Sequence, residues 1–539
     1  MTTAACVEAR PCSTPTAFCG TWRAARARVP RPGFPLGRRY KSPSYCPKAL
    51  FRASRNHVPP VERSALDSPE PVSESLPALE FSPSENACGD LAQGELFGPG
   101  LRGARDGRWR LRRAHGHARL GDPFEIVGQV KQAFGDLEQE LVGFGPLVAQ
   151  SVLALLTREN VLIFGPPGTA KTLYAGMLFG RIAHARVFDT QMSKGTLPEE
   201  LFGSIDVEEL KRGRTVHRTR DTLVDADLAF IDEFFDANDM VLRALLGVFN
   251  ERVFKKGTQV EPAALHTGIA AANYLRATEV TEAVLDRFLF RAYLGPDYGP
   301  FALLAVDRAF ARHYGRYAGP ARRQVPLAGL AYLADIACGL VPEFAIHASP
   351  HVLFLKNAVL NRYRELLEEA SEPGTRRPIY ISPRTYAKSR IVLNAAALLR
   401  GRREVRPEDL AQLKYVVTTI GGPPEQEQCF EKALSETLLR IRGADLEHID
   451  NLAAASELAE QLMARRRDGQ AVLPSGFLQR LLRFFGLLSE GEVTFDHLRR
   501  YVDGLHPHDD RVKALRQGVL QRIQELTRRV DGQAGPGWL

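Results

Sequence analysis

The stretch that decides the fold is a short apolar run, a glycine-bearing loop and the start of a helix: Val161-Leu162-Ile163-Phe164-Gly165-Pro166-Pro167-Gly168-Thr169-Ala170-Lys171-Thr172-Leu173. The apolar run has the length and composition of a buried parallel strand, and residues 173–180 have the composition of a helix. A strand, a glycine-bearing loop, a Lys-Thr pair and a helix, in this order, form the phosphate-binding P-loop. The sequence departs from the common pattern at Ala170, which stands before the lysine in place of glycine.

This loop predicts that ATP and Mg²⁺ are bound. The backbone N–H groups of the loop and the N-terminus of the helix are expected to face the phosphates. Lys171 is expected to reach the β- and γ-phosphates, and the Thr172 hydroxyl to bind Mg²⁺. The predicted nucleotide contacts in the loop are Gly165, Pro166, Pro167, Gly168, Thr169, Ala170, Lys171, Thr172 and Leu173.

A second apolar run, at 228–231, ends in the acids Asp232 and Glu233, 61 residues after Lys171. Asp232 is placed to hold Mg²⁺ through water, as a Walker B aspartate does. Glu233 would polarise the attacking water as the general base. Two acids at a strand end are weak evidence alone, but after a P-loop they indicate nucleotide hydrolysis.

Three more polar residues are candidates for the chemistry. A third predicted strand, at 268–272, ends at Asn273, which would orient the lytic water, although such an Asn is more often a turn residue. Arg287 closes a predicted helix at 282–288 and is a candidate arginine finger, with Arg291 as the alternative. Arg384 follows a proline at the start of another predicted helix and would reach the γ-phosphate from a second domain.

This ordered series resembles the AAA+ ATPases, and within them the MoxR group. The loop form with Ala before Lys is similar to that of the group, as are the segments at 197–203, 248–252, 285–289 and 382–384. The Pro-Glu-Glu-Leu-Phe-Gly stretch at 198–203, the segment at 248–252 and the Arg-Thr-Arg-Asp stretch at 218–221 are most similar to the RavA-type branch. The resemblance covers about residues 125–415.

The resemblance implies an α/β fold, with a P-loop AAA+ parallel-sheet core, an all-α lid and a C-terminal helical region. By resemblance, Asn273 is sensor 1, Arg287 the arginine finger and Arg384 sensor 2. The adenine pocket would include the backbone of Val142 and Gly143. A similar Val-Gly sequence occurs at 126–128, but we prefer the segment at 142–143 because it lies nearer the P-loop. An inserted hairpin at 204–220 would grip a partner, or is a solvated charged turn.

The function implied is that of an ATP-hydrolysing chaperone that forms a homohexameric ring and remodels a protein partner by assembly, cofactor insertion or disassembly. A von Willebrand factor A-domain protein is the implied partner. Two alternatives stay open. A nucleic-acid motor is disfavoured by the near-neutral body of the chain, so no nucleic acid is expected. A scaffold without turnover is disfavoured by the intact acids and Arg287.

Composition sets the domain boundaries. The 539 residues carry a net charge of +8, but the first 120 residues account for the whole surplus, and residues 121–539 are almost neutral. Residues 1–121 are rich in Arg, Pro, Ser and Gly, so we expect a disordered tail that is a transit peptide, an over-called start or a functional arm. We expect the nucleotide-binding core at 122–300, the lid at 301–420 and a helical domain of unknown role at 421–539.

The remaining expectations concern location and the helical regions. The absence of an apolar run of membrane length predicts no membrane span, and two isolated cysteines beyond the tail fit a reducing compartment, cytoplasmic or organellar. The leucines at 446, 452, 458 and 462 predict core packing, and the histidines and acids at 506–510 predict a polar turn in preference to a metal site. Helices are expected at 301–314, 327–338, 351–369, 383–399, 407–418, 426–442, 445–466, 476–486, 494–502 and 511–529.

Overall fold

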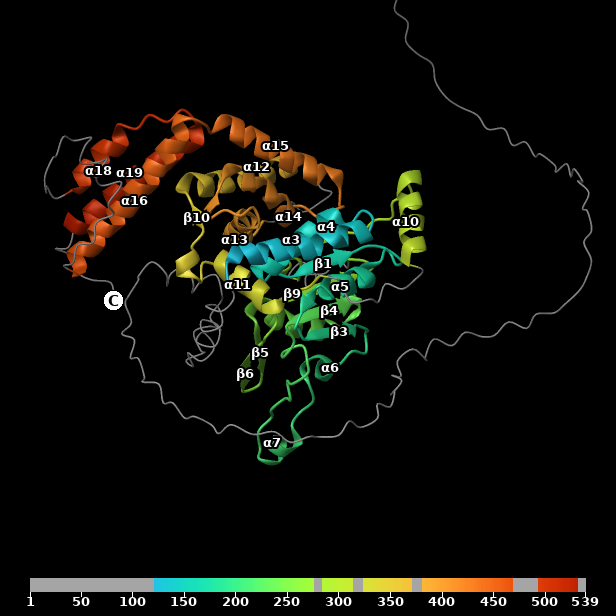
Figure 1. Ribbon diagram of the computed structural model, residues 1–539. Helices are drawn as coiled ribbons and strands as arrows, with labels where there is room; N and C mark the ends of the chain where they lie inside the picture. Colours follow the sequence, from blue (N-terminus) through green and yellow to red (C-terminus); the bar gives the residue numbers. More distant parts are fainter. Residues whose placement is uncertain (1–120, 276–283, 314–322, 371–380, 469–492, 532–539) are drawn as a thin grey trace, which may run out of the picture. The chain divides into compact units, whose positions relative to one another are not determined.

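The computed structural model describes residues 121–275, 284–313, 323–370, 381–468 and 493–531 (Figure 1). The expected tail, the predicted helix at 476–486 and the first part of the one at 282–288 lie outside these residues. Residues 284–287 are helical, as expected.

Five parallel strands form the central sheet, in the order β3-β4-β7-β1-β8. On one side of β1, Phe164 lies opposite Ala272 of β7, and on the other side it lies opposite Tyr293 of β8. Because the strands are parallel, the carboxyl ends of β1, β4 and β7 meet at one edge of the sheet. The three predicted strands are confirmed, whereas β3 and β8 had not been predicted. The strands are β1 (Val161–Phe164), β3 (Val187–Gln191), β4 (Leu228–Asp232), β7 (Thr267–Ala272) and β8 (Phe290–Tyr293).

Both faces of the sheet are covered, which is why the central strands β1 and β4 read as continuous apolar runs. Val161 and Ile163 of β1 pack into the core shared with α3 (Pro123–Glu140), α4 (Gly145–Thr157) and α5 (Lys171–Phe179). Leu162 faces the opposite way, into a second core with α8 (Asp239–Leu246) and the π-helical turn η3 (Gly247–Glu251). Strands β4 and β7 alternate between the two cores in the same way. The predicted α/β fold with a parallel sheet is therefore confirmed.

One buried amide fixes the start of β1 against its neighbours. Asn160 is 1% exposed, and its Nδ2 donates to the Phe249 carbonyl oxygen of η3 at 2.8 Å. Its Oδ1 accepts from the Gly268 N–H of β7 at 2.9 Å. This side chain thus joins β1, β7 and η3, and it sets the register that the carboxyl ends of the strands inherit.

Helices follow the sheet, as expected for the lid. They are α10 (Pro300–His313), α11 (Leu327–Ala337), α12 (Pro350–Ala370), α13 (Pro383–Leu399), η5 (Pro407–Leu413) and α14 (Lys414–Val417). The single helix predicted at 407–418 is wrong in type, since most of it is the 3₁₀ helix η5. The buried Asp409 carboxylate accepts from the Arg406 N–H at 2.8 Å and pairs with Arg402 at 2.8 Å, which favours a tight first turn.

The C-terminal helices confirm three further expectations. They are α15 (Pro424–Arg440), α16 (Ala444–Asp468), α18 (Phe495–Asp503) and α19 (Asp510–Asp531), with α15 packed on α12 and α16 on α19. Leu452 and Leu458 of α16 are buried core residues. The Asp445 carboxylate accepts from the N–H groups of His508 and Asp509, so the segment is a polar turn. The described residues contain no group of three or more His, Cys, Asp or Glu side chains that could hold a metal ion, and none of their helices has the length and apolarity to cross a membrane.

The smaller elements complete the chain. A two-residue pair, β2 with β9, joins the core to the lid region. These elements are β2 (Ile182–Ala183), α6 (Pro198–Phe202), α7 (Val207–Lys211), η2 (Phe234–Asp236), β5 (Val253–Lys256), β6 (Gln259–Pro262), β9 (Val325–Pro326), η4 (Pro342–Phe344), β10 (His347–Ala348) and β11 (Glu404–Val405).

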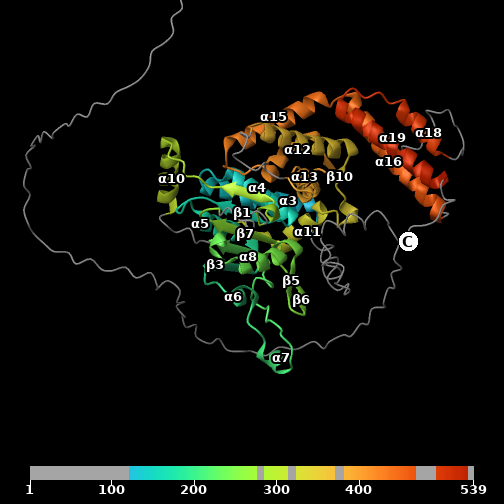
Figure 2. The ribbon, with the colours of Figure 1, turned by 180° about the vertical axis from the view of Figure 1, so that it is seen from behind.

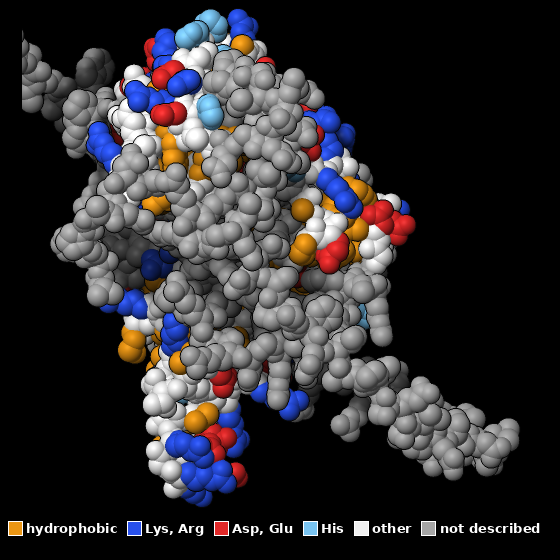
Figure 3. All heavy atoms as spheres, turned by 90° about the vertical axis from the view of Figure 1, so that its left-hand side faces the viewer, with side chains coloured by type: hydrophobic (Ala, Val, Ile, Leu, Met, Phe, Trp, Pro, Cys, Tyr) orange, Lys and Arg blue, Asp and Glu red, His pale blue; other side chains and the backbone are white. Residues whose placement is uncertain are grey.

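The insert at 204–220 turns back on itself, with Ile205 bridged to His217 and α7 between them. Figures 1 and 2 show α7 projecting away from the sheet, and Figure 3 shows charged side chains gathered on this projecting end. Ion pairs join Arg212 to Glu209 at 2.7 Å and Arg218 to Asp206 at 2.8 Å. The expected hairpin path is present, but its tip holds a helical turn whose charges are largely paired.

We predict that Gly268→Ala destabilises the protein. A Cβ at this position would lie 2.3 Å from Cε1 of the buried Phe249 ring, and such overpacking costs about 1–3 kcal/mol. The matched control is Gly128→Ala on α3, where a Cβ meets nothing within 4 Å and helix propensity favours alanine by about 1 kcal/mol. Thermal unfolding should show a lower Tm for the first variant and not for the second. A wild-type Tm for Gly268→Ala would contradict the described packing.

Candidate active site

The glycines of the loop after β1 satisfy steric demands of the backbone. A Cβ on Gly165 would lie 2.2 Å from the Leu294 carbonyl oxygen, so no larger residue fits there. Gly168 has φ +83°, in the left-handed region that favours glycine. The Leu294 N–H donates to the Phe164 carbonyl oxygen at 2.8 Å, so the segment after β8 supports the loop directly.

Two residues of the site that are not glycine hold left-handed backbones. Ala170, the N-cap of α5, has φ +60°, and Glu233, directly after β4, has φ +51°. Each costs about 1–2 kcal/mol relative to a right-handed conformation. Backbone strain of this kind is concentrated at functional sites, and here it lies on both sides of the predicted phosphate position.

Lys171 lies at the centre of the site, 7% exposed. Its Nζ donates to the Gly165 and Pro166 carbonyl oxygens at 2.8 and 3.0 Å, and to Asn273 Oδ1 at 2.8 Å. Burial lowers the pKa of Lys171, while the Asp232 and Glu233 carboxylates act to raise it. The ammonium is therefore held by weak neutral acceptors, which a phosphate can replace with stronger charge-assisted hydrogen bonds.

The predicted magnesium ligands are in contact with one another. Thr172 Oγ1 donates to Asp232 Oδ2 at 2.8 Å, and Asp232 Oδ1 accepts from the Glu233 N–H at 2.9 Å. Asp189 of β3, which sequence reasoning missed, lies with Thr172 in the lining of a hollow of about 250 Å³. Partial burial, and then repulsion from Asp232, raise the pKa of Asp189. A hydroxyl and two carboxylates are hard oxygen donors of the kind that Mg²⁺ prefers, so these residues fit the ion.

Glu233 and Asn273 meet at the ends of β4 and β7. Asn273 Nδ2 donates to Glu233 Oε1, while Asn273 Oδ1 accepts from Lys171. Burial raises the pKa of Glu233, and the charges of Asp232 and Asp236 raise it further. A carboxylate with a raised pKa is a better proton acceptor, as a general base requires. Asn273 holds it in place beside the predicted position of the γ-phosphate.

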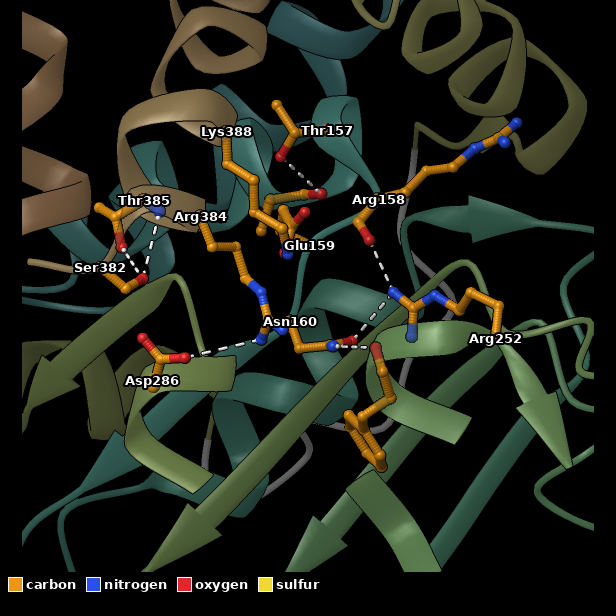
Figure 4. A network of polar contacts seen from close by, with 12 residues as sticks. Thr157, Arg158, Glu159, Asn160, Arg252, Asp286, Ser382, Arg384, Thr385 and Lys388 are labelled. Atoms are coloured by element: carbon orange, nitrogen blue, oxygen red, sulfur yellow. Dashed lines mark hydrogen bonds and ion pairs between the residues drawn. The ribbon is translucent and has the colours of Figure 1, made fainter. Parts of the chain in front are cut away.

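The predicted arginines lie together, away from the P-loop lysine. Arg287 and Arg384 line a cavity of about 560 Å³, whose other basic residues are Arg243, Lys255 and Lys256. Arg384 forms an ion pair with Asp286 at 3.6 Å, and Figure 4 shows the two side chains pointing toward one another. None of the residues that line this cavity belongs to the P-loop. The two arginines are thus brought together, but not to Lys171.

The structure does not support Arg291 as the alternative finger. Arg291 is on β8, opposite Leu162 of β1, and it does not line the arginine cavity. Burial lowers the pKa of Arg291, and the Asp286 carboxylate acts to raise it. The Arg291 side chain is half-buried and lies apart from the cavity that Arg287 and Arg384 line.

The predicted adenine segment lies against the helix that begins at the P-loop. Gly143 has φ +81°, and the neighbouring Phe144 ring stacks on Tyr174 of α5 with centroids 5.4 Å apart. Gly128 of the rejected alternative lies inside α3, where backbone N–H groups are used within the helix. The assignment of Val142 and Gly143 remains a prediction that this placement favours.

Three contributors could not be recognised from the sequence. Asp189 lies between Phe188 and Thr190 in a strand that the sequence analysis had not predicted. Asn160 had been only the residue before the first strand. Leu294 acts through its backbone, so its side chain carries no signal. The weak signal for β3, and therefore for Asp189, is the strand propensity of the β-branched and aromatic residues Val187, Phe188 and Thr190.

Comparisons with known proteins agree with this geometry. Residues 128–297 match the family model of the MoxR domain in the MoxR-vWA-beta-propeller ternary systems, and residues 357–434 match an AAA lid domain. An uncharacterized protein of Methanocaldococcus jannaschii is 35% identical over 142 residues, which cover 26% of this chain and 38% of that protein. The chaperone MoxR1 of Mycobacterium tuberculosis is 30% identical over 173 residues, which cover 31% and 45%.

A second uncharacterized protein of Methanocaldococcus jannaschii is similar over a longer segment. It is 27% identical over 283 residues, which cover 49% of this chain and 64% of that protein. The chain thus spans less than two thirds of the length of each of these relatives.

We predict that turnover has an acid limb above the ordinary range of a glutamate. Glu233 must be deprotonated to accept a proton, so activity is full above its raised pKa and is lost as the pH falls through it. Asn273→Ala removes a hydrogen bond that stabilises the carboxylate, so the limb should move to higher pH. Asp236→Asn removes a repelling charge, so the limb should move to lower pH. Profiles of kcat against pH at saturating ATP measure both shifts, and shifts of the same sign would contradict the role of Glu233.

Proposed function

We propose that the chain, whose residues 128–297 match a MoxR domain and whose residues 357–434 match an AAA lid domain, is a MoxR-type AAA+ ATPase. In this proposal it hydrolyses ATP in a ring of identical subunits and uses this energy to remodel a protein partner. The observation that carries the proposal is the chain of contacts from Lys171 through Asn273 to Glu233, beside the Thr172–Asp232 pair. Phosphate-binding lysine, water-orienting amide, base and metal ligands are together at one edge of the sheet.

The contacts suggest how the chain's own residues take part. Phosphate oxygens replace Asn273 and the loop carbonyls as partners of Lys171, and the loop N–H groups bind them as well. Released from Lys171, Asn273 keeps its hydrogen bond to Glu233 and orients a water molecule. Glu233 accepts a proton from that water as the water oxygen attacks the γ-phosphorus. The bond between the γ-phosphorus and the β–γ bridging oxygen breaks, and ADP and phosphate are released. Thr172 and Asp232 would hold Mg²⁺, which neutralises charge on the phosphates when bound.

Ring assembly is supported by the separation of the arginines from the P-loop. Arg287 and Arg384 line their own cavity, whose lining includes no phosphate-binding residue. In Figure 1, α5, which begins at the P-loop, and the β5–β6 hairpin, whose β5 lines the arginine cavity, lie on different sides of the core. A contact between two different surfaces of identical subunits is head-to-tail, and it forms a ring when the rotation between neighbours closes. We therefore assign both arginines to the ATP of the neighbouring subunit.

A second support for assembly is the apolar surface of α10. Among residues 298–310, six large hydrophobic side chains are exposed, including Phe301 at 86% and Phe310 at 58%. Leu303, Val306 and Phe310 recur at helical spacing and so share one face of α10. An exposed face of large apolar side chains on a helix is typical of a surface that contacts another protein. In the described part of the chain, no element packs extensively on α10. The helix begins a few residues after Leu294, whose N–H donates to the residue before the P-loop.

The partner is proposed from the family model. Its description places the MoxR domain in systems with a vWA and a beta-propeller protein, so a von Willebrand factor A-domain protein is the first partner to test. The projecting insert at 204–220 is the surface that we propose contacts it. The closer relationship to the RavA-type branch is a further part of this proposal, and it rests on the resemblance at 198–203 and 248–252.

We predict that two inactive variants restore each other. Lys171→Ala should lose tight ATP binding in calorimetry, because the ammonium paired with the phosphates is gone. Arg287→Ala should bind ATP but hydrolyse it about 10³- to 10⁵-fold more slowly. In rings co-expressed from both, some interfaces pair an intact Lys171 with an intact Arg287. Those interfaces should release phosphate.

The control for this experiment is Glu233→Gln, which should bind ATP without hydrolysing it. In rings that mix Glu233→Gln with Arg287→Ala subunits, an Arg287→Ala subunit keeps an intact P-loop and Glu233. Its ATP can be served by the intact Arg287 of a neighbouring Glu233→Gln subunit, so activity should also return. Mixed rings are obtained by tandem purification on two different tags. Mixed rings that stay inactive would contradict the assignment of Arg287 to the neighbour.

We predict that charges on α10 break the assembly. Phe301→Glu with Phe310→Glu should convert the oligomer to smaller species, because burying carboxylates in an apolar contact is costly. ATP affinity per subunit should be unchanged. Leu439→Glu is the matched control, since Leu439 is also exposed, at 65%, but lies on α15. Light scattering coupled to size-exclusion chromatography measures the mass. An unchanged mass of the double variant would show that another copy does not cover α10.

A further inference from the structure

Two consecutive residues between α4 and β1 each form an ion pair with a lid helix. Arg158 pairs with Asp335 of α11 at 2.6 Å, and Glu159 pairs with Lys388 of α13 at 2.7 Å. The Glu159 and Lys388 side chains are only 12% and 15% exposed. An ion pair removed from water in this way is screened less than a surface pair. These residues therefore fix two lid helices to the start of the P-loop strand.

The segment that carries Glu159 is itself held rigidly. Arg252 Nη2 donates to the Arg158 carbonyl oxygen at 2.6 Å and to Asn160 Oδ1 at 3.2 Å, on either side of Glu159. Burial lowers the pKa of Arg252 to about 10. Arg158 has φ +55°, which turns the chain sharply from α4 into β1. Figure 4 shows Arg252 meeting this segment from one side and Lys388 meeting Glu159 from the other.

Lys388 lies one helical turn after Arg384 on α13, so the two side chains share one face of that helix. Figure 4 shows both directed toward the core, Lys388 at Glu159 and Arg384 at Asp286. The contact of Arg384 is the weaker of the two, since its ion pair is 3.6 Å long and its side chain is 43% exposed. The body of α13 packs on α4, α11 and η5, and the tighter pair adds a polar contact near its first turns, on the face that carries Arg384.

We propose that Glu159 and Lys388 are positioning residues for Arg384. The pair fixes α13 against the start of β1, so that Arg384 stands beside Arg287 in the arginine cavity and reaches the ATP of the neighbouring subunit. This inference rests on the proposed function, in which Arg384 acts on the neighbour. It has a consequence for each subunit. Strand β1, which leads into a subunit's own P-loop, is linked through Glu159 and Lys388 to Arg384, the arginine that this subunit supplies to its neighbour.

The first test is steady-state hydrolysis by Glu159→Gln and Lys388→Gln. A misplacement of about 1 Å costs on the order of 100-fold in rate. We therefore expect kcat to fall 10- to 100-fold, with the KM for ATP and the Tm close to wild type. The charge-reversed pair, Glu159→Lys with Lys388→Glu, should recover much of kcat. Arg362→Gln is the matched control, because it breaks an ion pair of α12 with α15 at 2.8 Å and should leave kcat unchanged.

The decisive test asks which side of the subunit interface is damaged. Mixed rings of Glu159→Gln with Lys171→Ala contain interfaces that join an intact P-loop to an intact Arg384, so activity should return. Mixed rings of Glu159→Gln with Arg384→Ala contain no correctly placed Arg384, so they should stay inactive. A pair that instead supports its own P-loop predicts the opposite pattern. That opposite pattern, or wild-type kcat for both single variants, would overturn the proposal.

The outcomes also separate this inference from the proposed function. A wild-type chain that binds but does not hydrolyse ATP would refute the proposed function. A wild-type chain that hydrolyses ATP, with rescue between Lys171→Ala and Arg287→Ala but not in the Glu159→Gln series, would refute the positioning role alone. If Glu159→Gln lowers the Tm strongly, Lys388→Gln replaces it in both mixtures, because Lys388 lies on the lid rather than beside the P-loop strand.

Discussion

The parallel pairing of β1 with β7 is the constraint on which the site depends. The ladder places Phe164 opposite Ala272, and the Gly165 N–H continues it by donating to the Ala272 carbonyl oxygen at 3.1 Å. The P-loop follows β1 directly, and Asn273 follows β7 directly. Lys171 and Asn273 therefore come within hydrogen-bond distance. A slip of one residue would turn Asn273 to the other face of the sheet. Asn160, at the opposite end of the strands, protects this register.

The site is arranged around charges that a nucleotide would complete. The carboxylates of Asp232 and Glu233 lie near Lys171. Burial and the repulsion from Asp232 raise the pKa of Glu233 and of Asp189. Strained backbones at Ala170 and Glu233 hold the loop and the base in place. The arginines that would neutralise transition-state charge lie in a separate cavity. In our proposal each subunit therefore carries two incomplete halves of a site, and assembly and hydrolysis are linked for this reason.

The sequence predicted the parts that depend on local patterns. The buried strands at 161–164, 228–232 and 267–272 and most lid helices were found because apolar runs and helix starts are local signals. The Lys171, Asp232 and Asn273 cluster followed because parallel strands end at one edge. Asp189 was missed because an edge strand with mixed residues resembles a loop. The Glu159–Lys388 pair was missed because its members are 229 positions apart, and the placement of Arg384 beside Asp286 depends on how the lid packs, which no local pattern determines.

The most direct measurement is an electron cryomicroscopy structure of the Glu233→Gln variant with ATP and Mg²⁺. The account predicts a ring with nucleotide at the P-loop, the Lys171 ammonium on the phosphates and its contact with Asn273 broken. Arg287 and Arg384 of the neighbouring subunit should face the γ-phosphate. The account would be contradicted if nucleotide bound elsewhere, or if both arginines reached the phosphates of their own subunit.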